Sequence, residues 1–227
     1  MQKSEINYLV IQSTYQEIEV ALFRNSNCIA VSSISKLEAS SKLIPKIETL
    51  LAELSLTIND LDFIGSNQGP APFTTLRTAI ATINGLRFAT NISLVGINGL
   101  EAFAQQILPK SKNVVVIWNA FGESAYYAIR KAGVVEFGWE PIDKLVMQLQ
   151  QTFPNQPVQV CGQGLKIFEK KLEALHSNFE LNTEADQFPK IELIAEKALV
   201  KYRKGEFSHG PLDPIYLKQA EPLVAIK

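Results

Sequence analysis

A loop rich in glycine and proline, at residues 65–72, leads directly into a predicted helix. Together, this loop and helix constrain the fold of the chain more than any other segment does. The residues before the loop, 61–65, are mostly apolar and predict a short strand. The residues after it, 73–89, repeat apolar side chains at helical spacing. A strand that turns tightly into a long helix is typical of an α/β fold, in which the helix packs back on the sheet.

The predicted helix has two faces of different character, which point in opposite directions at about 100° per residue. The first face is apolar and is expected to pack on the chain's own sheet: Leu76, Ala79, Ile80 and Ile83. The second face is small and nearly flat: Thr78, Thr82, Gly85 and Ala89. A flat face allows a second helix to approach closely, so this face predicts a protein partner.

The rest of the chain continues the mixture of strands and helices. We expect strands at residues 8–11, 17–23, 28–31, 63–64, 93–95, 113–118, 124–130, 134–137 and 158–161. We expect helices at residues 41–54, 73–89, 100–107, 141–151, 164–172 and 191–202. Ser40 or Ser41 is expected to cap the first helix. Together these elements place the chain in the mixed α/β class.

The composition limits what the chain can bind by itself. Its 22 basic and 23 acidic residues give a net charge of -1, which does not favour tight RNA binding without help. The two cysteines, Cys28 and Cys161, lie far apart and lack CxxC spacing, as expected of reduced residues in a reducing compartment. No apolar run is long enough to span a membrane, so we expect a cytoplasmic protein.

Several short motifs resemble the bacterial TsaB family of tRNA threonylcarbamoyladenosine biosynthesis proteins. The start of the central helix is similar to the family's Gly-Pro-Gly-Ser-Phe-Thr-Gly-Leu-Arg motif, with matches at Gly69, Pro70, Phe73, Thr74, Leu76 and Arg77. Residues 41–45, 94–97, 100–102 and 214–218 are also similar to family segments. The resemblance implies an actin-like ATPase (ASKHA) fold with two α/β subdomains, each a mixed sheet flanked by helices. The expected parts are residues 1–108, a smaller subdomain at 109–189, and a helix and tail at 190–227 that pack back on the first subdomain.

Residues that would bind phosphate or metal in such a fold are replaced in this chain. Actin-like ATPases hold their metal through a carboxylate after the first strand, where this chain has Gln12. Ala71 and Thr75 replace glycines of the family loop, and Pro70 and Pro72 lack the backbone N–H groups that cradle anions. The sequence therefore predicts a rigid turn in place of a phosphate cradle.

Other catalytic groups are missing too. The two histidines, His176 and His209, are too far apart for the His-x-x-x-His metal pair of the TsaD paralogue, and they give no recognisable catalytic triad. Asn119 and Phe121 replace the Asp and Arg of a further family segment. These losses predict a non-catalytic subunit without a metal or cofactor, although ATP or ADP at the interface of a complex stays open.

Two other functions remain open from the residues alone. The chain could be a small-molecule kinase-like enzyme of the same superfamily, with Asp60 or Asp62 as the metal-holding carboxylate. It could instead be a nucleotide-binding module without turnover. Gly162 and Gly164 precede a predicted helix and could face a nucleotide, or they could simply form the turn before that helix. Lys166, Lys170 and Lys171 alternate with glutamates, which is typical of a solvated face.

The resemblance also implies a set of partners. The chain would pair with a TsaD-like catalytic subunit, help to recruit a TsaE-like ATPase, and meet tRNA only through that complex. It would form a homodimer through the same surface when alone. The residues expected at this surface come from the helices at 41–54 and 73–89: Leu43, Ile47, Leu50, Leu54, Thr74, Arg77, Thr78, Thr82, Gly85 and Ala89. The first helix is included because its apolar stripe is wider than one sheet contact needs, unless another helix of the chain covers it.

Overall fold

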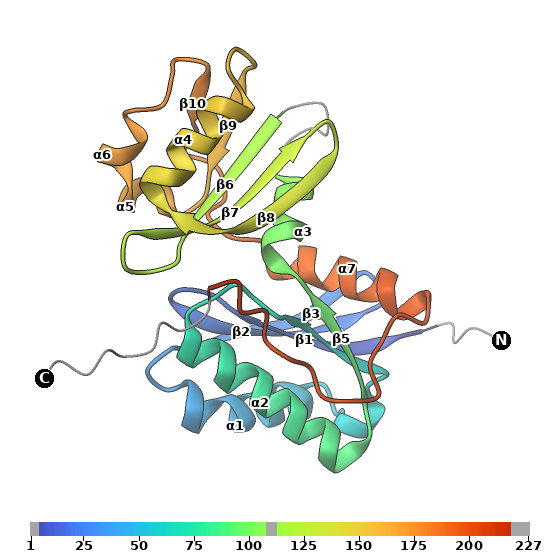
Figure 1. Cartoon of the computed structure of the whole chain (residues 1–227). Coiled ribbons are helices and arrows are strands. Elements are labelled where there is room, and N and C mark those ends of the chain that lie inside the picture. The colour runs from blue at the N-terminus through green and yellow to red at the C-terminus, as the bar shows by residue number, and fades with distance from the viewer. Residues whose placement is uncertain (1–4, 108–112, 219–227) are drawn as a thin grey trace, which may run out of the picture. The chain divides into compact units, whose positions relative to one another are not determined.

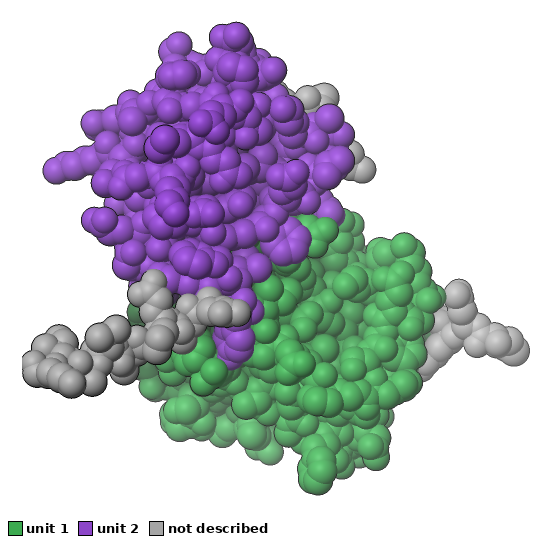
Figure 2. Space-filling view, in the orientation of Figure 1, with its two compact units in different colours: residues 1–103, 188–215 green, residues 104–187, 216–227 purple. Residues whose placement is uncertain are grey.

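The structure is a computed structural model that describes residues 5–107 and 113–218 (Figure 1). The chain divides into two compact units, which Figure 2 colours separately. Unit 1 contains residues 1–103 and 188–215, and unit 2 contains residues 104–187 and 216–227. The subdomain border expected after residue 108 lies outside the described residues. Of the described residues of the tail, those up to Ile215 group with unit 1, and Tyr216, Leu217 and Lys218 group with unit 2.

Unit 1 is built on a five-stranded mixed sheet with the order β3-β2-β1-β4-β5. The strands are β1 (Asn7–Ser13), β2 (Glu17–Arg24), β3 (Asn27–Ser35), β4 (Phe63–Asn67) and β5 (Ser93–Ile97). β1, β2 and β3 form an antiparallel meander, and β4 and β5 continue the sheet parallel to β1. The tight turn between β2 and β3 uses Asn25 at φ 52°, a left-handed conformation that asparagine tolerates well.

Helices cover both faces of this sheet (Figure 1). α1 (Ala39–Glu53) and α2 (Phe73–Thr90) pack on one face, and α7 (Ile191–Arg203) packs on the other. Because side chains of a strand alternate between faces, Leu9 and Ile11 of β1 join the α1 and α2 layer, whereas Tyr8 and Val10 join the α7 layer. A short 3₁₀ helix, η1 (Ile58–Asp60), precedes β4, and α3 (Gly99–Gln106) follows β5.

Unit 2 repeats the same chain path. Its sheet has the order β10-β9-β6-β7-β8. The strands are β6 (Asn113–Asn119), β7 (Ser124–Lys131), β8 (Val134–Pro141), β9 (Val158–Cys161) and β10 (Phe179–Leu181). The helices are α4 (Ile142–Thr152), α5 (Gly164–Ile167) and α6 (Glu169–Leu172). Three antiparallel strands are again followed by two strands parallel to the first. This duplicated arrangement is the actin-like fold that the resemblance implied.

Three local features differ from the sequence-based expectation. α1 begins at Ala39, before both candidate caps, and Glu38 at its N-cap position makes no side-chain capping bond. The helix expected over 164–172 is broken at Phe168, whose buried ring belongs to the core of unit 2. β10 was not expected, because a three-residue strand with Glu180 at its centre carries no alternating apolar pattern.

A candidate protein-binding surface on helix α2

The turn before α2 is held rigidly by its own hydrogen bonds. Gly69 adopts φ +111°, which favours glycine, and its N–H donates to Oδ1 of Asn67 over 2.8 Å. The N–H of Gln68 donates to the carbonyl of Ile97, also over 2.8 Å. Two backbone donors of the loop are thus already used, and Pro70 and Pro72 have none. This is the rigid strand-to-helix turn that the sequence predicted.

One half of α2 fills the core of unit 1, as predicted. Leu76, Ala79, Ile80 and Ile83 are buried against the sheet, together with Thr75. These side chains belong to the same apolar cluster as Leu9, Ile11 and Val20 of the sheet. Burial of this face fixes how the helix is rotated, so the position of every other α2 side chain follows from it.

The other half of α2 is not covered by the described residues. Thr74, Arg77, Gly85 and Ala89 are exposed, and Thr78 and Thr82 are partly exposed. A Cβ placed on Gly85 would have no atom within 4 Å, so the flat centre of this face meets no part of the described chain. Phe88, which belongs to no motif in the sequence, is 91% exposed near the C-terminal end of α2. We call these seven residues, with Phe73, the α2 face.

Polar groups on the α2 face have partners within the helix itself. The guanidinium carbon of Arg77 lies 3.7 Å from the centre of the Phe73 ring, one helical turn away. The hydroxyl of Thr78 donates to the carbonyl of Thr74 over 3.0 Å. A partner helix would therefore meet a surface whose small hydroxyl groups are partly satisfied, which lowers the cost of removing water from it.

A segment near the C-terminal end of the described chain runs beside α2. The side chain of Asn84 donates to the carbonyl of Leu212 over 3.0 Å and accepts from its N–H over 2.8 Å. Arg87 donates to the carbonyls of Ile92 and His209. A cavity of about 370 Å³ lies here, lined by Asn84, Arg87, Phe88, Asn91, His209, Gly210 and Pro211. Asn84 and Arg87 could not be predicted as contact residues from the sequence, since neither stands in a motif.

The residues expected on α1 lie in the interior of unit 1. Leu43, Ile47 and Leu50 are 1%, 2% and 4% exposed, and Leu54 packs against the same cluster. Their stripe is covered by β-strand side chains and by α2, so the chain itself uses the extra apolar width. On α1 it is Ile44, 48% exposed, that remains available to a partner. Of the residues expected at a partner surface, the structure therefore brings together on an open face only those of α2.

Gln12, in place of a metal-holding carboxylate, is engaged in the fold. It is 1% exposed, and its Nε2 donates to Oε2 of Glu19 over 2.8 Å and to the carbonyl of Pro189 over 2.7 Å. Burial raises the pKa of Glu19, against the opposing effect of this hydrogen bond. Asp60 accepts bonds from Thr57, and Asp62 accepts one from Asn7. Both residues precede β4 and so lie at its amino end. α/β sheets bind their ligands at the opposite, carboxyl ends of the strands.

Comparison with known proteins connects this geometry with a family. The family model described as "TsaD: tRNA N6-adenosine threonylcarbamoyltransferase" matches residues 32–194. The chain belongs to the TsaD family. Within it the chain is a divergent TsaB-like protein: the TsaB of Haemophilus influenzae is 23% identical over 94% of this chain and 94% of its own length.

Other relatives in the TsaD family match over shorter stretches. A TsaB of Buchnera aphidicola is 28% identical over 49% of this chain and 54% of its own length. A tRNA N6-adenosine threonylcarbamoyltransferase of Clostridium botulinum is 32% identical over 44% of this chain and 34% of its own length. Among solved structures, a Pseudomonas aeruginosa protein with similarity to peptidase YeaZ has a TM-score of 0.71 at 20% identity, covering 94% of this chain and 100% of that one. YeaZ of the same organism has a TM-score of 0.68 at 19% identity, covering 91% and 99%. These structures show the same fold.

In unit 2 of this TsaB-like chain, the glycine pair has a packing role. Gly162 has φ +106°, and a Cβ there would lie 2.6 Å from the carbonyl oxygen of Ile117. A Cβ on Gly164 would lie 2.8 Å from the same oxygen. Only glycine lets the start of α5 approach β6 this closely, so the structure explains both residues as the turn before the helix.

The segment that departs from the TsaB-family motif forms the turn between β6 and β7. Oδ1 of Asn119 accepts a hydrogen bond from the N–H of Phe121, a residue that is 53% exposed. A cavity of about 510 Å³ adjoins this turn and is lined by side chains of both charge signs, among them Glu123, Glu169, Lys166, Lys170 and Lys171. Lys171 is paired with Asp143 at 2.9 Å, which raises the pKa of the lysine. The lysines thus lie among carboxylates, as the alternating sequence predicted.

Two negative findings bear on the described residues alone. Residues 5–107 and 113–218 contain no group of three or more His, Cys, Asp or Glu side chains arranged to hold a metal ion. Over the same ranges, every helix is too short or too polar to cross a lipid bilayer.

Proposed function

We propose that this chain is a non-catalytic subunit of the complex that forms N6-threonylcarbamoyladenosine in tRNA, next to the anticodon. Its place in the TsaD family and its similarity to TsaB over nearly the whole chain support this role. The observation that carries the proposal is the α2 face, half of a long helix that the described chain leaves open. We propose that a TsaD-like catalytic subunit packs on it.

The proposal assigns catalysis to the partner. Gln12 stands where actin-like ATPases hold a metal-binding carboxylate, and its buried amide is committed to Glu19 and Pro189. Of the alternative carboxylates, Asp60 accepts a hydrogen bond from Thr57 in the turn before β4, and Asp62 accepts one from the N–H of Asn7 at the start of β1. This chain would hold the TsaD-like subunit in a competent state and help to recruit a TsaE-like ATPase. With a net charge of -1, it would meet tRNA through the assembled complex in the cytoplasm.

The test is complex formation between this chain and the TsaD-like protein of its own source, followed by light scattering after gel filtration. Thr82→Arg places a long charged side chain on the α2 face, where a close helix contact cannot accommodate it. We expect the affinity to fall by on the order of 100-fold or more, as for other central interface residues. The chain should keep its circular dichroism spectrum, because Thr82 is outside the buried half of α2.

Val200→Arg is a matched control. Val200 lies on α7, which covers the opposite face of the same sheet, and is 46% exposed. It adds the same charge and should leave the complex intact. Equal binding by Thr82→Arg and the control would remove the α2 face from the interface.

No cofactor of this chain is part of the proposal. A complex that forms only with ATP or ADP would instead place a nucleotide at the interface.

A further inference from the structure

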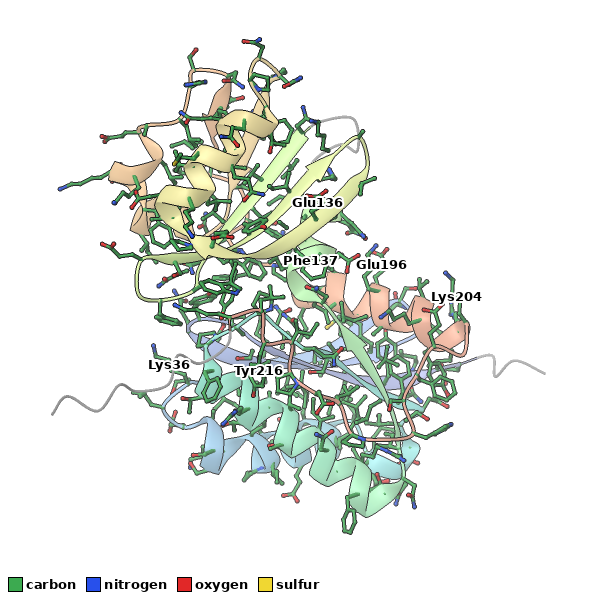
Figure 3. All side chains as sticks on the ribbon, in the orientation of Figure 1. Lys36, Glu136, Phe137, Glu196, Lys204 and Tyr216 are labelled. Carbon is green, nitrogen blue, oxygen red and sulfur yellow. The ribbon has the colours of Figure 1, made fainter. Side chains whose placement is uncertain are left out.

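The segment that follows α7 forms one wall of the cavity at the C-terminal end of α2. It runs between Lys204 and Tyr216, which Figure 3 labels. Ser208 pairs with Leu94 of β5 through two backbone hydrogen bonds, of 3.0 and 2.8 Å. The side chain of Asn84 on α2 holds the segment through two more. Because a strand and a helix both fix this segment, the cavity wall is in place before any partner binds.

Arg87, in the last turn of α2, brings a positive charge to this cavity. Its two terminal nitrogens each donate to a carbonyl, one of Ile92 and one of His209. The carbonyls fix the guanidinium without neutralising it, and among the described residues no salt bridge includes Arg87. Each terminal nitrogen has a second N–H to donate. The guanidinium is thus preorganised for an anion, and a carboxylate matches its planar fork.

The rest of the cavity lining suits the same chemistry. Asn84 and Asn91 contribute amides and His209 an imidazole, all of which can donate hydrogen bonds, and the lining contains no Asp or Glu. The C-terminal end of a helix carries about half a negative charge, which by itself disfavours an anion. The full positive charge of Arg87 outweighs it.

The cavity is continuous with the α2 face, because Phe88 belongs to both. An exposed aromatic ring beside an arginine is typical of the few residues that dominate the binding energy of protein interfaces. The volume of about 370 Å³ is at the low end for small-molecule sites. Continuity with the α2 face and a chain net charge of -1 both favour a protein group over RNA as the occupant.

We propose that this cavity receives a carboxylate side chain of the TsaD-like subunit, which pairs with Arg87 while Phe88 packs beside it. The inference rests on the proposed function and adds the chemistry of one contact at the end of the α2 face. Small side chains such as Gly85 and Thr82 let a helix approach, but they do not fix its position along α2. A charged contact at one end sets that register.

Two variants change the charge of the cavity in different ways. Arg87→Gln removes the positive charge, whereas Asn91→Asp adds a carboxylate to the lining and leaves Arg87 in place. Titration calorimetry with the TsaD-like subunit should show affinity lowered by about tenfold or more in both. For Arg87→Gln the affinity should also depend less on salt. Circular dichroism checks the folding of both variants, and Asn91→Asp decides the matter if loss of the Arg87 bonds disturbs the fold.

Asn27→Asp is the matched control, with the same nearly isosteric change of charge. Asn27 is exposed on β3 and does not line the cavity, so this variant should bind as the unchanged chain does.

Arg87→Lys identifies the group that is bound. A carbodiimide joins an amine to a carboxylate in contact with it, whereas a guanidinium does not react. The variant should therefore give a cross-link from position 87 to an Asp or Glu of the TsaD-like subunit, which peptide mass spectrometry locates and which the unchanged chain cannot form.

The outcomes separate this inference from the function on which it rests. If Arg87→Gln and Asn91→Asp bind with full affinity while Thr82→Arg does not, the carboxylate contact is wrong and the proposed function stands. If the Arg87→Gln complex is intact but retains less tRNA, the cavity holds a phosphate, and the inference is again overturned. If the unchanged chain forms no complex, the proposed function fails and this inference fails with it.

Discussion

Gln12 shows how one residue changes what a strand end can do. Its side chain is buried at the carboxyl end of β1, and Nε2 makes both of its hydrogen bonds, to Glu19 and Pro189. Within the described part of the chain, Oε1 is buried and has no hydrogen-bond partner. A neutral amide in this position bridges β2 and the segment before α7. The sequence alone predicted the loss of the carboxylate, but it could not predict this bridge, whose ends are 177 residues apart.

This cluster gives a pH-dependent prediction. Burial, with help from Glu17 and Glu192, raises the pKa of Glu19. A raised carboxyl pKa means that the folded state favours the protonated form of Glu19. The protonated side chain therefore contributes stability at acidic pH, and this contribution is lost as the pH rises through the pKa of the folded state. Glu19→Gln removes that loss, and its new amide can donate to Oε1 of Gln12. We expect about 1 kcal/mol more stability at pH 7 and a smaller gain at pH 4.

Chemical denaturation of both proteins at the two pH values provides the measurement. Glu53→Gln is the control, because Glu53 is exposed on α1 and is not among the groups that raise the pKa of Glu19. If Glu19→Gln raises the free energy of unfolding equally at the two pH values, or more at pH 4, the destabilisation does not come from the ionised carboxylate of Glu19.

At the scale of elements, small residues decide how closely helices approach the sheet of unit 1. A Cβ placed on Gly65 of β4 would lie 2.9 Å from Cβ of Ala198 on α7, closer than two methyl groups can pack. At Gly85 on α2 a Cβ would meet nothing within 4 Å. Two glycines in the same unit therefore have different physical roles, one as a close contact and one as a flat exposed surface.

The contrast predicts opposite effects of the same substitution. Gly65→Ala should destabilise unit 1 by about 1–3 kcal/mol, because α7 has to move away from β4. Gly85→Ala should stabilise it by about 0.5–1 kcal/mol, because alanine is the better helix former at an exposed position. Urea denaturation followed by far-ultraviolet circular dichroism measures both. A loss of stability in Gly85→Ala would mean that this position is not open.

Periodicity predicted the elements themselves well. The expected helix at 73–89 corresponds to α2 at Phe73–Thr90, and the four apolar residues chosen as its core face are all buried. Periodicity was less informative about α1, where the stripe of Leu43, Ile47 and Leu50 was expected to serve a partner and lies in the core. A stripe of apolar residues shows that a face is covered, but not which element covers it.

At the scale of the whole molecule, the two units share a duplicated topology that the sequence does not display. Both sheets follow the order of a three-stranded meander extended by two parallel strands, yet we detected no internal repeat in the residues. Each unit has its own apolar clusters. Backbone hydrogen bonding and the burial of alternating faces constrain the path of the chain, while many combinations of apolar residues fill such a core equally well.

The separate cores make a prediction about unfolding. Both tryptophans of the chain, Trp118 and Trp139, belong to unit 2, so tryptophan fluorescence reports on that unit alone. We expect the urea transition followed by fluorescence to differ from the one followed by circular dichroism, which detects both units. Gly65→Ala should shift the circular dichroism transition and leave the fluorescence midpoint unchanged. Superimposable transitions in both proteins would show that the two units unfold as one.

The sequence by itself determined the α/β class, the family resemblance, the two faces of α2 and a neutral residue, Gln12, at the end of the first strand. These are local properties, because they depend on residue identity and on spacing along one element. Only the tertiary structure decided that α1 is used internally and that Gly162 and Gly164 serve packing. These properties depend on which segments meet in space although they are tens of residues apart, as Gly162 and Ile117 are, and no local pattern records that.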